Sequence, residues 1–363
     1  MTPTLIPDIE HAILQWTDPH LQTDLLTAGC IRRIQADRDK ARIEISLGYP
    51  AASYRDEMAR NIREQLLLSA PSLRQVDIQI DWSISAHVSH SKAAPMRRVS
   101  NLIAIASGKG GVGKSTTAAN LALALTAEGA KVGLLDADIY GPSLPMMLGI
   151  PADARPDTRD QKYFVPLTAH GVQVMSMGVL VTENTPMVWR GPMASGALQQ
   201  LLNQTLWEDL DYLIIDMPPG TGDIQLTLSQ SAPLTAAAIV TTPQDIALLD
   251  AKKGIEAFRK IQVPVLGIIE NMSMHVCSQC GHMEHIFGEG GGERIAQEYQ
   301  TGFLGSLPLD IRIREQSDAG KPYVFSDPHS KIAASYREIA RQMAGRLSLL
   351  PVSSNIPNVV HIS

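Results

Sequence analysis

Short apolar runs alternate with longer segments of helical periodicity from residue 100 onward. Each run is apolar on both faces, which is typical of strands in a parallel sheet that helices cover on both sides. The predicted strands are residues 102–106, 132–136, 172–176, 212–216, 236–242, 265–269 and 303–307. This order of elements predicts an α/β domain with a mostly parallel sheet over residues 100–350.

The first 85 residues follow a different pattern, in which amphipathic helices and alternating strands are mixed. The predicted elements are a helix at 6–16, two strands within 30–47, a helix at 53–69 and a strand at 73–82. Ser53 is expected to cap the second helix. We therefore expect a small α/β domain at 1–85, a linker at 86–99 and a loose tail at 351–363.

Composition narrows the class of protein. The 363 residues carry a net charge of −6, which argues against a broad nucleic-acid-binding face. The N-terminal sequence shows no secretory signal pattern, and no apolar run is long enough for a membrane span. Three cysteines do not make a disulfide framework and suit a reducing compartment. We expect a cytoplasmic protein that binds neither nucleic acid nor membrane.

The sequence GKGGVGKST at residues 108–116 follows the first apolar run and precedes a helical segment. It matches the G-x-x-x-x-G-K-[ST] motif, in which glycines let backbone N–H groups turn toward phosphate oxygens at a helix N-terminus. Lys114 is expected to contact the β- and γ-phosphates of ATP, Ser115 to bind Mg²⁺, and Thr116 to make a further phosphate contact. The predicted nucleotide-binding residues of this loop are Gly108, Lys109, Gly110, Gly111, Val112, Gly113, Lys114, Ser115 and Thr116.

Acidic residues end two other predicted strands. Asp216 ends the run 212–216, where a carboxylate would hold the hydration shell of Mg²⁺. Asp136 and Asp138 follow the run 132–136. Because ligands of parallel sheets bind at the carboxyl ends of the strands, these residues are expected near the phosphate loop. For Asp136 a functional role and a role in the turn remain equally open.

The additional lysine of the loop, Lys109, gives the sequence a more specific resemblance. It resembles the deviant Walker A family, which includes the MinD and ParA positioning ATPases, the arsenite-pump ATPases and the nitrogenase iron protein. The resemblance implies a nucleotide-sandwiched homodimer in which Lys109 reaches the partner's phosphates. It also implies that Asp138 lies in switch I and orients the attacking water, so that Lys109, Lys114 and Asp138 are the expected catalytic residues. Asp216 and residues 217–223 would form switch II.

Five further stretches narrow the resemblance within this family: LDADIYGPSLPMMLGI at 135–150, DMPPGTGD at 216–223, GIIENMSMHVCSQCGH at 267–282, IFGEGGGERIA at 286–296 and LGSLPLDIRIREQSDAGKP at 304–322. They resemble the Mrp/ApbC-type iron–sulfur cluster carrier ATPases, and the N-terminal part resembles the MIP18-like domain often fused to them. The resemblance implies slow ATP hydrolysis coupled to the transfer of a cluster to apo-proteins, with cluster assembly scaffolds as further partners. It also implies that Asn271 hydrogen bonds the adenine and that Pro308 packs near it.

Cys277 and Cys280 lie three positions apart and supply two thiolate ligands. Iron–sulfur clusters and structural zinc need about four, and a twofold dimer would bring a second pair opposite the first. We therefore expect a [4Fe–4S] cluster between two subunits. Three alternatives remain: a zinc site that adds His282 and His285, a redox-active pair, and two unrelated thiols. Cys30, which has no cysteine nearby, is expected to be an ordinary buried thiol.

A second function remains open, that of a ParA- or MinD-like positioning ATPase acting on membrane or DNA. MinD-like members carry a basic amphipathic helix at the C-terminus, whereas no Lys or Arg follows Arg346 here. The cysteine pair would also have no role in such a protein, so the sequence favours the cluster carrier.

Overall fold

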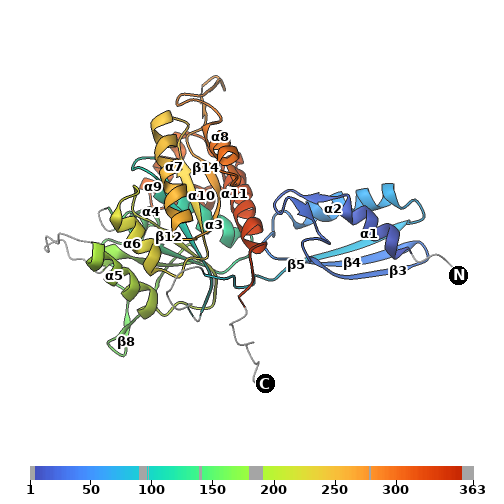
Figure 1. Cartoon of the computed structure of the whole chain (residues 1–363), viewed down its shortest axis with the longest axis horizontal. Helices are drawn as coiled ribbons and strands as arrows, with labels where there is room; N and C mark the ends of the chain where they lie inside the picture. Colours follow the sequence, from blue (N-terminus) through green and yellow to red (C-terminus); the bar gives the residue numbers. More distant parts are fainter. Residues whose placement is uncertain are drawn as a thin grey trace. The chain divides into compact units, whose positions relative to one another are not determined.

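The computed structural model describes residues 5–89, 96, 98–138, 141–179, 191–277 and 279–353 (Figure 1). It divides into two compact units. The first contains Met1–Ser85, Ala127–Gly129 and Arg341–Leu350, and the second contains Ala86–Thr126, Ala130–Ala340 and Pro351–Ser363. These limits differ from the predicted domain boundaries because two short segments distant in the sequence pack with the first unit.

The first unit is a three-stranded sheet with two helices. Its strand order is β3-β4-β5, with β3 and β4 antiparallel and β4 and β5 parallel. The side chains of β4 alternate between buried and exposed positions, as the sequence pattern predicts for a half-buried strand. Its elements are α1 (Ile6–Leu14), β1 (Thr17–Asp18), β2 (Thr23–Asp24), β3 (Ile31–Asp37), β4 (Lys40–Leu47), α2 (Arg55–Ser69) and β5 (Gln75–Trp82).

The predicted capping role of Ser53 is wrong. The residue that precedes α2 is Tyr54, and no side chain caps this helix. The Ser53 hydroxyl instead donates a hydrogen bond to Glu128 Oε1 at 2.5 Å, and its backbone N–H donates to Glu128 Oε2 at 2.9 Å. Arg341 pairs with the same carboxylate at 2.6 Å. A buried ion pair from a distant part of the chain has therefore replaced the local cap, because an unpaired Glu128 would cost more than a missing cap.

The second unit is built on an eight-stranded sheet of order β10-β11-β7-β12-β6-β13-β14-β17. All pairs are parallel except β10 with β11. Each of the seven predicted strands is present, and the antiparallel edge strand β10 was not predicted. The strands are β6 (Val99–Ala106), β7 (Val132–Asp136), β10 (Leu167–Ala169), β11 (Val172–Ser176), β12 (Leu210–Asp216), β13 (Ala236–Thr241), β14 (Val265–Glu270) and β17 (Phe303–Ser306).

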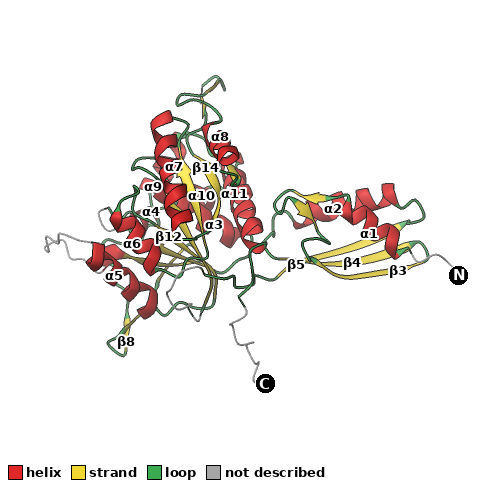
Figure 2. Cartoon of the chain, in the orientation of Figure 1, coloured by secondary structure: helices red, strands yellow, loops and turns green. Residues whose placement is uncertain are grey.

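Helices lie on both faces of this sheet (Figure 2). Leu198, Leu228, Phe258 and Ile295 bring four helices into one buried cluster with the strands. On the other face, Ile339 lies so close to Gly305 of β17 that a Cβ there would meet it at 2.9 Å. The helices are α3 (Lys114–Ala127), α4 (Leu144–Met147), η1 (Met177–Val179), α5 (Gly191–Gln204), α6 (Asp223–Ser231), α7 (Asp245–Lys260), α8 (Gly291–Glu298), α9 (Ile311–Asp318), α10 (Tyr323–Ser326) and α11 (Lys331–Ser348).

Two small hairpins complete the second unit: β8 (Thr158–Arg159) with β9 (Tyr163–Phe164), and β15 (His275–Val276) with β16 (Met283–Glu284). Residues 351–353 are hydrogen bonded to 86–88, so the predicted loose tail does not begin at residue 351. Residues 354–363 and most of 90–97 lie outside the described part of the chain. Within the described ranges, no helix is both long and apolar enough to cross a membrane.

The topology brings the carboxyl ends of three strands together at the centre of the sheet. β12 lies between β6 and β7, and Asp216 is in register with Asp136 of β7 and Ile105 of β6. The loop that follows β6 runs directly into α3. The parallel sheet thus places the glycine-rich loop beside both acidic strand ends, as the sequence predicts.

Candidate functional site

The glycine-rich loop follows β6, and α3 begins at Lys114. Gly111 and Gly113 both have a φ of 81°, a left-handed conformation that favours glycine. A Cβ at Gly113 would lie 2.2 Å from Asn271 Nδ2, and a Cβ at Gly108 would lie 2.2 Å from the backbone of Asp250. Glycine is required here by the close approach of neighbouring segments as well as by the conformation of the loop.

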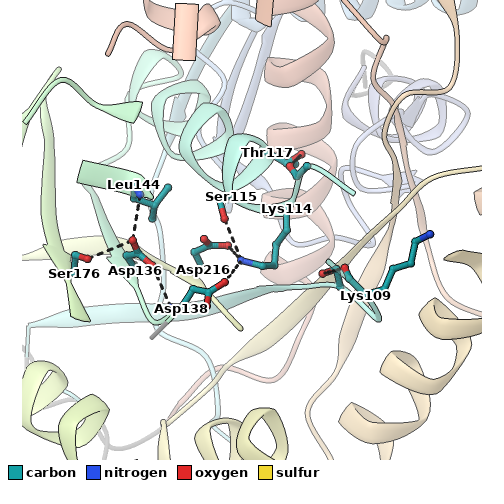
Figure 3. Close-up of polar contacts among 11 residues, drawn as sticks. Lys109, Lys114, Ser115, Thr117, Asp136, Asp138, Leu144, Ser176 and Asp216 are labelled. Carbon is teal, nitrogen blue, oxygen red and sulfur yellow. Dashed lines mark hydrogen bonds and ion pairs between the residues drawn. The ribbon is translucent and has the colours of Figure 1, made fainter. Parts of the chain in front are cut away.

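Lys114 is at the centre of the charged groups (Figure 3). Its Nζ lies 2.5 Å from Asp216 Oδ1, 3.2 Å from Ser115 Oγ and 4.0 Å from Asp138 Oδ2. Lys114 and Asp216 are both buried, so their ion pair is shielded from water. The structure brings together four predicted residues that lie up to about 100 positions apart.

Asp216 carries a raised pKa, chiefly because of burial, although the neighbouring Lys114 charge lowers it. Its second oxygen, Oδ2, is buried and has no hydrogen-bond partner among the described residues. A buried carboxylate oxygen without a donor is costly, and a metal-bound water could supply the missing contact. The Asp216 carboxylate and the Ser115 hydroxyl are oxygen ligands of the kind that Mg²⁺ prefers, so these residues fit a magnesium site.

Asp136, whose role the sequence left open, organises the loop between β7 and α4. Its carboxylate accepts hydrogen bonds from the backbone N–H of Asp138 at 3.1 Å, from the backbone N–H of Leu144 at 3.1 Å and from Ser176 Oγ at 3.3 Å. Burial, and then the charge of Asp216, raise the pKa of Asp136 to about 7. The strand-end position was the available signal: two of the donors follow within eight residues, whereas Ser176, 40 positions away, could not be identified from spacing.

Lys109 is not part of this charged cluster. Its side chain is half-buried and points away from Lys114, as Figure 3 shows. No ion pair joins it to another residue within the described ranges. Only its backbone carbonyl has a local role, accepting a hydrogen bond from Ser107 Oγ at 2.9 Å. Thr116 likewise contacts its own helix, through the hydrogen bond from Asn120 Nδ2 to its carbonyl.

Asn271 directly follows β14 and is buried. Its Nδ2 donates a hydrogen bond to the backbone carbonyl of Val112 at 2.9 Å, so it contacts the phosphate loop itself. Pro308 is half-buried just after β17, and its neighbour Leu307 accepts a hydrogen bond from the backbone N–H of Ser273 at 3.0 Å. The structure therefore places Asn271 beside the loop and Pro308 on the segment that is hydrogen bonded to the one following Asn271.

The cysteine pair lies on the turn between β15 and β16. Cys277 donates its backbone N–H to the His282 carbonyl, and its own carbonyl accepts from Gly281 N–H, both at 2.9 Å. Cys277 is half-buried and Cys280 is exposed. The pKa of Cys277 is lowered, first by the backbone N–H of Cys280 and then by that of Gln279. Both effects favour a thiolate, the form that binds soft metals.

The alternative zinc set is not assembled in this structure. Among the residues described here, no group of three or more His, Cys, Asp and Glu side chains is arranged to hold a metal ion. His285 Nδ1 donates to the Ser273 carbonyl at 2.8 Å, which orients its ring. The redox-pair alternative required a helix that starts at the first cysteine, whereas Cys277 follows a strand.

Cys30 differs from this pair in every respect that bears on reactivity. It is buried, and burial raises its pKa to about 11. It therefore stays protonated at neutral pH and behaves as the core thiol that the sequence predicts.

Comparison with known families adds to this geometry. A family model described as the NUBPL iron-transfer P-loop NTPase matches residues 98–344. The chain belongs to this family. A second model, described as an iron–sulfur cluster assembly protein, matches residues 7–80. The two matches confirm the resemblance that the sequence motifs indicate.

Individual relatives extend the similarity over both parts of the chain. An iron–sulfur cluster carrier protein of Pseudomonas fragi is 62% identical over 263 residues, covering 72% of this chain and 92% of the relative. One of Haemophilus influenzae is 49% identical over 344 residues, covering 93% of this chain and 91% of the relative. A solved nucleotide-binding protein of Archaeoglobus fulgidus in complex with ADP is 37% identical, with a TM-score of 0.55, over 62% of this chain and 88% of its own.

Membership of the NUBPL iron-transfer family makes this chain a P-loop NTPase with the predicted parallel-sheet fold. The family match includes the phosphate loop, the acidic strand ends and the cysteine hairpin within residues 98–344. Nucleotide chemistry and a candidate metal-binding thiol pair therefore lie in the same unit.

Proposed function

We propose that this chain is an ATP-hydrolysing iron–sulfur cluster carrier that holds a [4Fe–4S] cluster between two copies and transfers it to apo-proteins. One observation carries the proposal: an accessible Cys-x-x-Cys pair, with a thiolate-favouring backbone, sits on a hairpin of a P-loop NTPase. The relatives named as iron–sulfur cluster carrier proteins support it. Apo-proteins and cluster assembly scaffolds are the proposed partners, and the cytoplasm is the proposed location.

ATP is proposed to bind across residues 108–116, with Asn271 and Pro308 beside the adenine. Lys114 now neutralises Asp216, and the same Nζ would neutralise the β- and γ-phosphates once ATP is bound. Mg²⁺, held by Ser115 and through water by Asp216, would supply further charge neutralisation. With ATP bound, Lys114 would pair with the phosphates instead of with Asp216. ATP binding would therefore change the charge at the carboxyl end of β12.

Hydrolysis is proposed to depend on positioning and charge rather than on a strong general base. Asp138 lies 4.0 Å from Lys114 and would orient the attacking water at the γ-phosphate. Asp136 accepts hydrogen bonds from the backbone N–H of Asp138 and from that of Leu144, and so holds the backbone at Asp138. Lys109 points away from its own site, as a residue that serves the partner's phosphates would. The expected turnover is slow.

The cluster is proposed to be cargo shared between two hairpins. Cys277 and Cys280 supply two thiolates, and the same pair of a second copy supplies the other two. A cluster held on exposed turns at a symmetry axis is accessible to an acceptor protein. A ParA- or MinD-like positioning role would leave this hairpin without a function, so the carrier is the function that the site supports best.

Anaerobic reconstitution with iron and sulfide tests the proposal. The wild-type chain should develop broad absorption near about 400 nm, typical of thiolate-bound clusters. Cys277→Ser and Cys280→Ser should each lose it while still binding ATP. Cys30→Ser is the matched control and should keep it, because Cys30 is buried in the other unit. Full iron and sulfide in a Cys277→Ser variant would contradict the shared-cluster model.

A further inference from the structure

A single short segment joins the phosphate loop to the cysteine hairpin. At one end, Asn271 Nδ2 donates to the Val112 carbonyl at 2.9 Å, and both Asn271 and the methyl group of Met272 lie against Gly113. At the other end, six residues further, is Cys277. Any change in the loop at Val112 and Gly113 therefore acts directly on the start of the segment that leads to the thiol.

The backbone between these ends is held residue by residue. Met272 has a φ of 57°, a left-handed conformation that costs a non-glycine residue energy and is kept only where its surroundings enforce it. The backbone N–H and the Oγ of Ser273 both donate to the Leu307 carbonyl at 3.0 Å. Leu309 N–H donates to the Met274 carbonyl at 2.7 Å. A segment fixed in this way transmits a displacement instead of absorbing it.

The two arms of the hairpin are tied to the same segment. His275 Nδ1 donates to the Leu309 carbonyl at 3.0 Å and begins the first arm. His285, just beyond the second arm, donates from Nδ1 to the Ser273 carbonyl at 2.8 Å. Residues 273–275 are therefore the base from which both cysteines project, and a shift of this base moves the pair as a unit.

We infer that Asn271 is the positioning residue through which nucleotide in the phosphate loop sets the geometry of Cys277 and Cys280. The inference rests on the proposed function and adds its coupling path. When phosphates draw the loop amides inward, the Val112 carbonyl moves, and the hydrogen bond to Asn271 carries that movement through the strained Met272 to the base of the hairpin. The same amide is adjacent to the proposed adenine site, so it responds to base and phosphate together.

Thiol alkylation of the full-length apo-protein tests the inference. The rate at Cys277 and Cys280 is measured with iodoacetamide, with and without MgATP, at about ten times each variant's own Kd to equalise occupancy. Trypsin leaves Cys277 and Cys280 together in the peptide 261–294 and Cys30 in the peptide 1–32. Mass spectrometry therefore distinguishes alkylation of the pair from alkylation of Cys30. We expect MgATP to change the wild-type rate at least about fivefold, within the range of typical coupling between sites.

Asn271→Ala is expected to bind ATP more weakly, because Asn271 lies beside the proposed adenine site, and a fluorescent analogue measures its Kd. At matched nucleotide occupancy this variant should lose the change in alkylation rate. Ser273→Ala is the matched control: it loses the Oγ bond but keeps the backbone N–H bond to Leu307 and the link from Asn271 to Val112, so it should retain the change in alkylation rate. The inference would be overturned if MgATP changed the alkylation rate of Asn271→Ala as much as that of the wild type, or left the wild-type rate unchanged. It would also be overturned if Asn271→Ala and Ser273→Ala lost the effect of MgATP equally. Cluster reconstitution of the same samples shows independently whether the proposed carrier function holds.

Discussion

Replacing Lys114 with alanine would leave Asp216 buried without its counter-charge. The two side chains lie 2.5 Å apart and are 6% and 0% exposed, so the pair is shielded from bulk water. Removing one partner of a buried pair costs about 3–5 kcal/mol. We therefore expect Lys114→Ala to lower the free energy of unfolding of the second unit by about 3 kcal/mol or more at pH 8, in addition to abolishing ATP binding.

The loss should depend on pH in a defined direction. Lys114 lowers the pKa of Asp216, which burial already raises, so the variant raises that pKa further. The folded variant then keeps a proton that the unfolded chain has released, and its stability falls as pH rises. The deficit of Lys114→Ala relative to the wild type should therefore be smaller at pH 5 than at pH 8.

Hydrogen exchange of β6 and β12 amides in increasing urea measures this free energy for the second unit alone. Lys109→Ala is the matched control and should change it by less than about 0.5 kcal/mol, because Lys109 is half-buried and points away from the cluster. Lys114→Ala combined with Asp216→Asn should recover most of the loss. Wild-type stability in Lys114→Ala, or no recovery in the double variant, would show that the pair of Lys114 and Asp216 does not stabilise the second unit.

Three other substitutions test separate parts of the structure. Asp136→Asn should flatten the fall of unfolding free energy with pH between 3.8, the ordinary pKa of an aspartate, and the folded pKa of about 7. Urea titration across that range measures the slope, and an unchanged slope would contradict the expectation. Asp138→Ala should leave the Kd for ATP unchanged but lower kcat about 100-fold. An equally large loss of ATP affinity would show that Asp138 serves only to bind the nucleotide. Tyr49→Phe removes the hydroxyl that donates to buried Asp18 at 2.7 Å and should destabilise the first unit by about 1–3 kcal/mol in thermal unfolding, whereas a neutral effect would contradict that bond's contribution.

The sheet of the second unit was predictable because its strands are apolar on both faces and are separated by helices. All seven predicted strands are present, and only the three-residue edge strand β10 was missed. An edge strand of that length, exposed on one side, has no apolar run to detect. The residues 108–116 were identifiable because phosphate binding constrains residue types at fixed spacing.

Contacts between distant segments were not predictable. Ser53 looked like a helix cap, but the competing partner, Glu128, is 75 residues away. For Asp136, the contact with Ser176 spans 40 positions and gives no signal in the local sequence. Asn271 was expected beside the adenine through family resemblance alone, and its hydrogen bond to Val112 spans 159 positions. Local pattern identifies an element, whereas such pairings depend on how the elements pack.

The iron, sulfide and zinc content of the anaerobically reconstituted protein, together with its mass in solution, shows whether two chains share one cluster. A cluster shared by two hairpins predicts about four iron and four sulfide per two chains, in a species of twice the chain mass of 39.4 kDa. Cys277→Ser should return both the metal content and the mass to those of the apo-protein. One zinc per chain, or a full cluster on a single chain, would contradict the account.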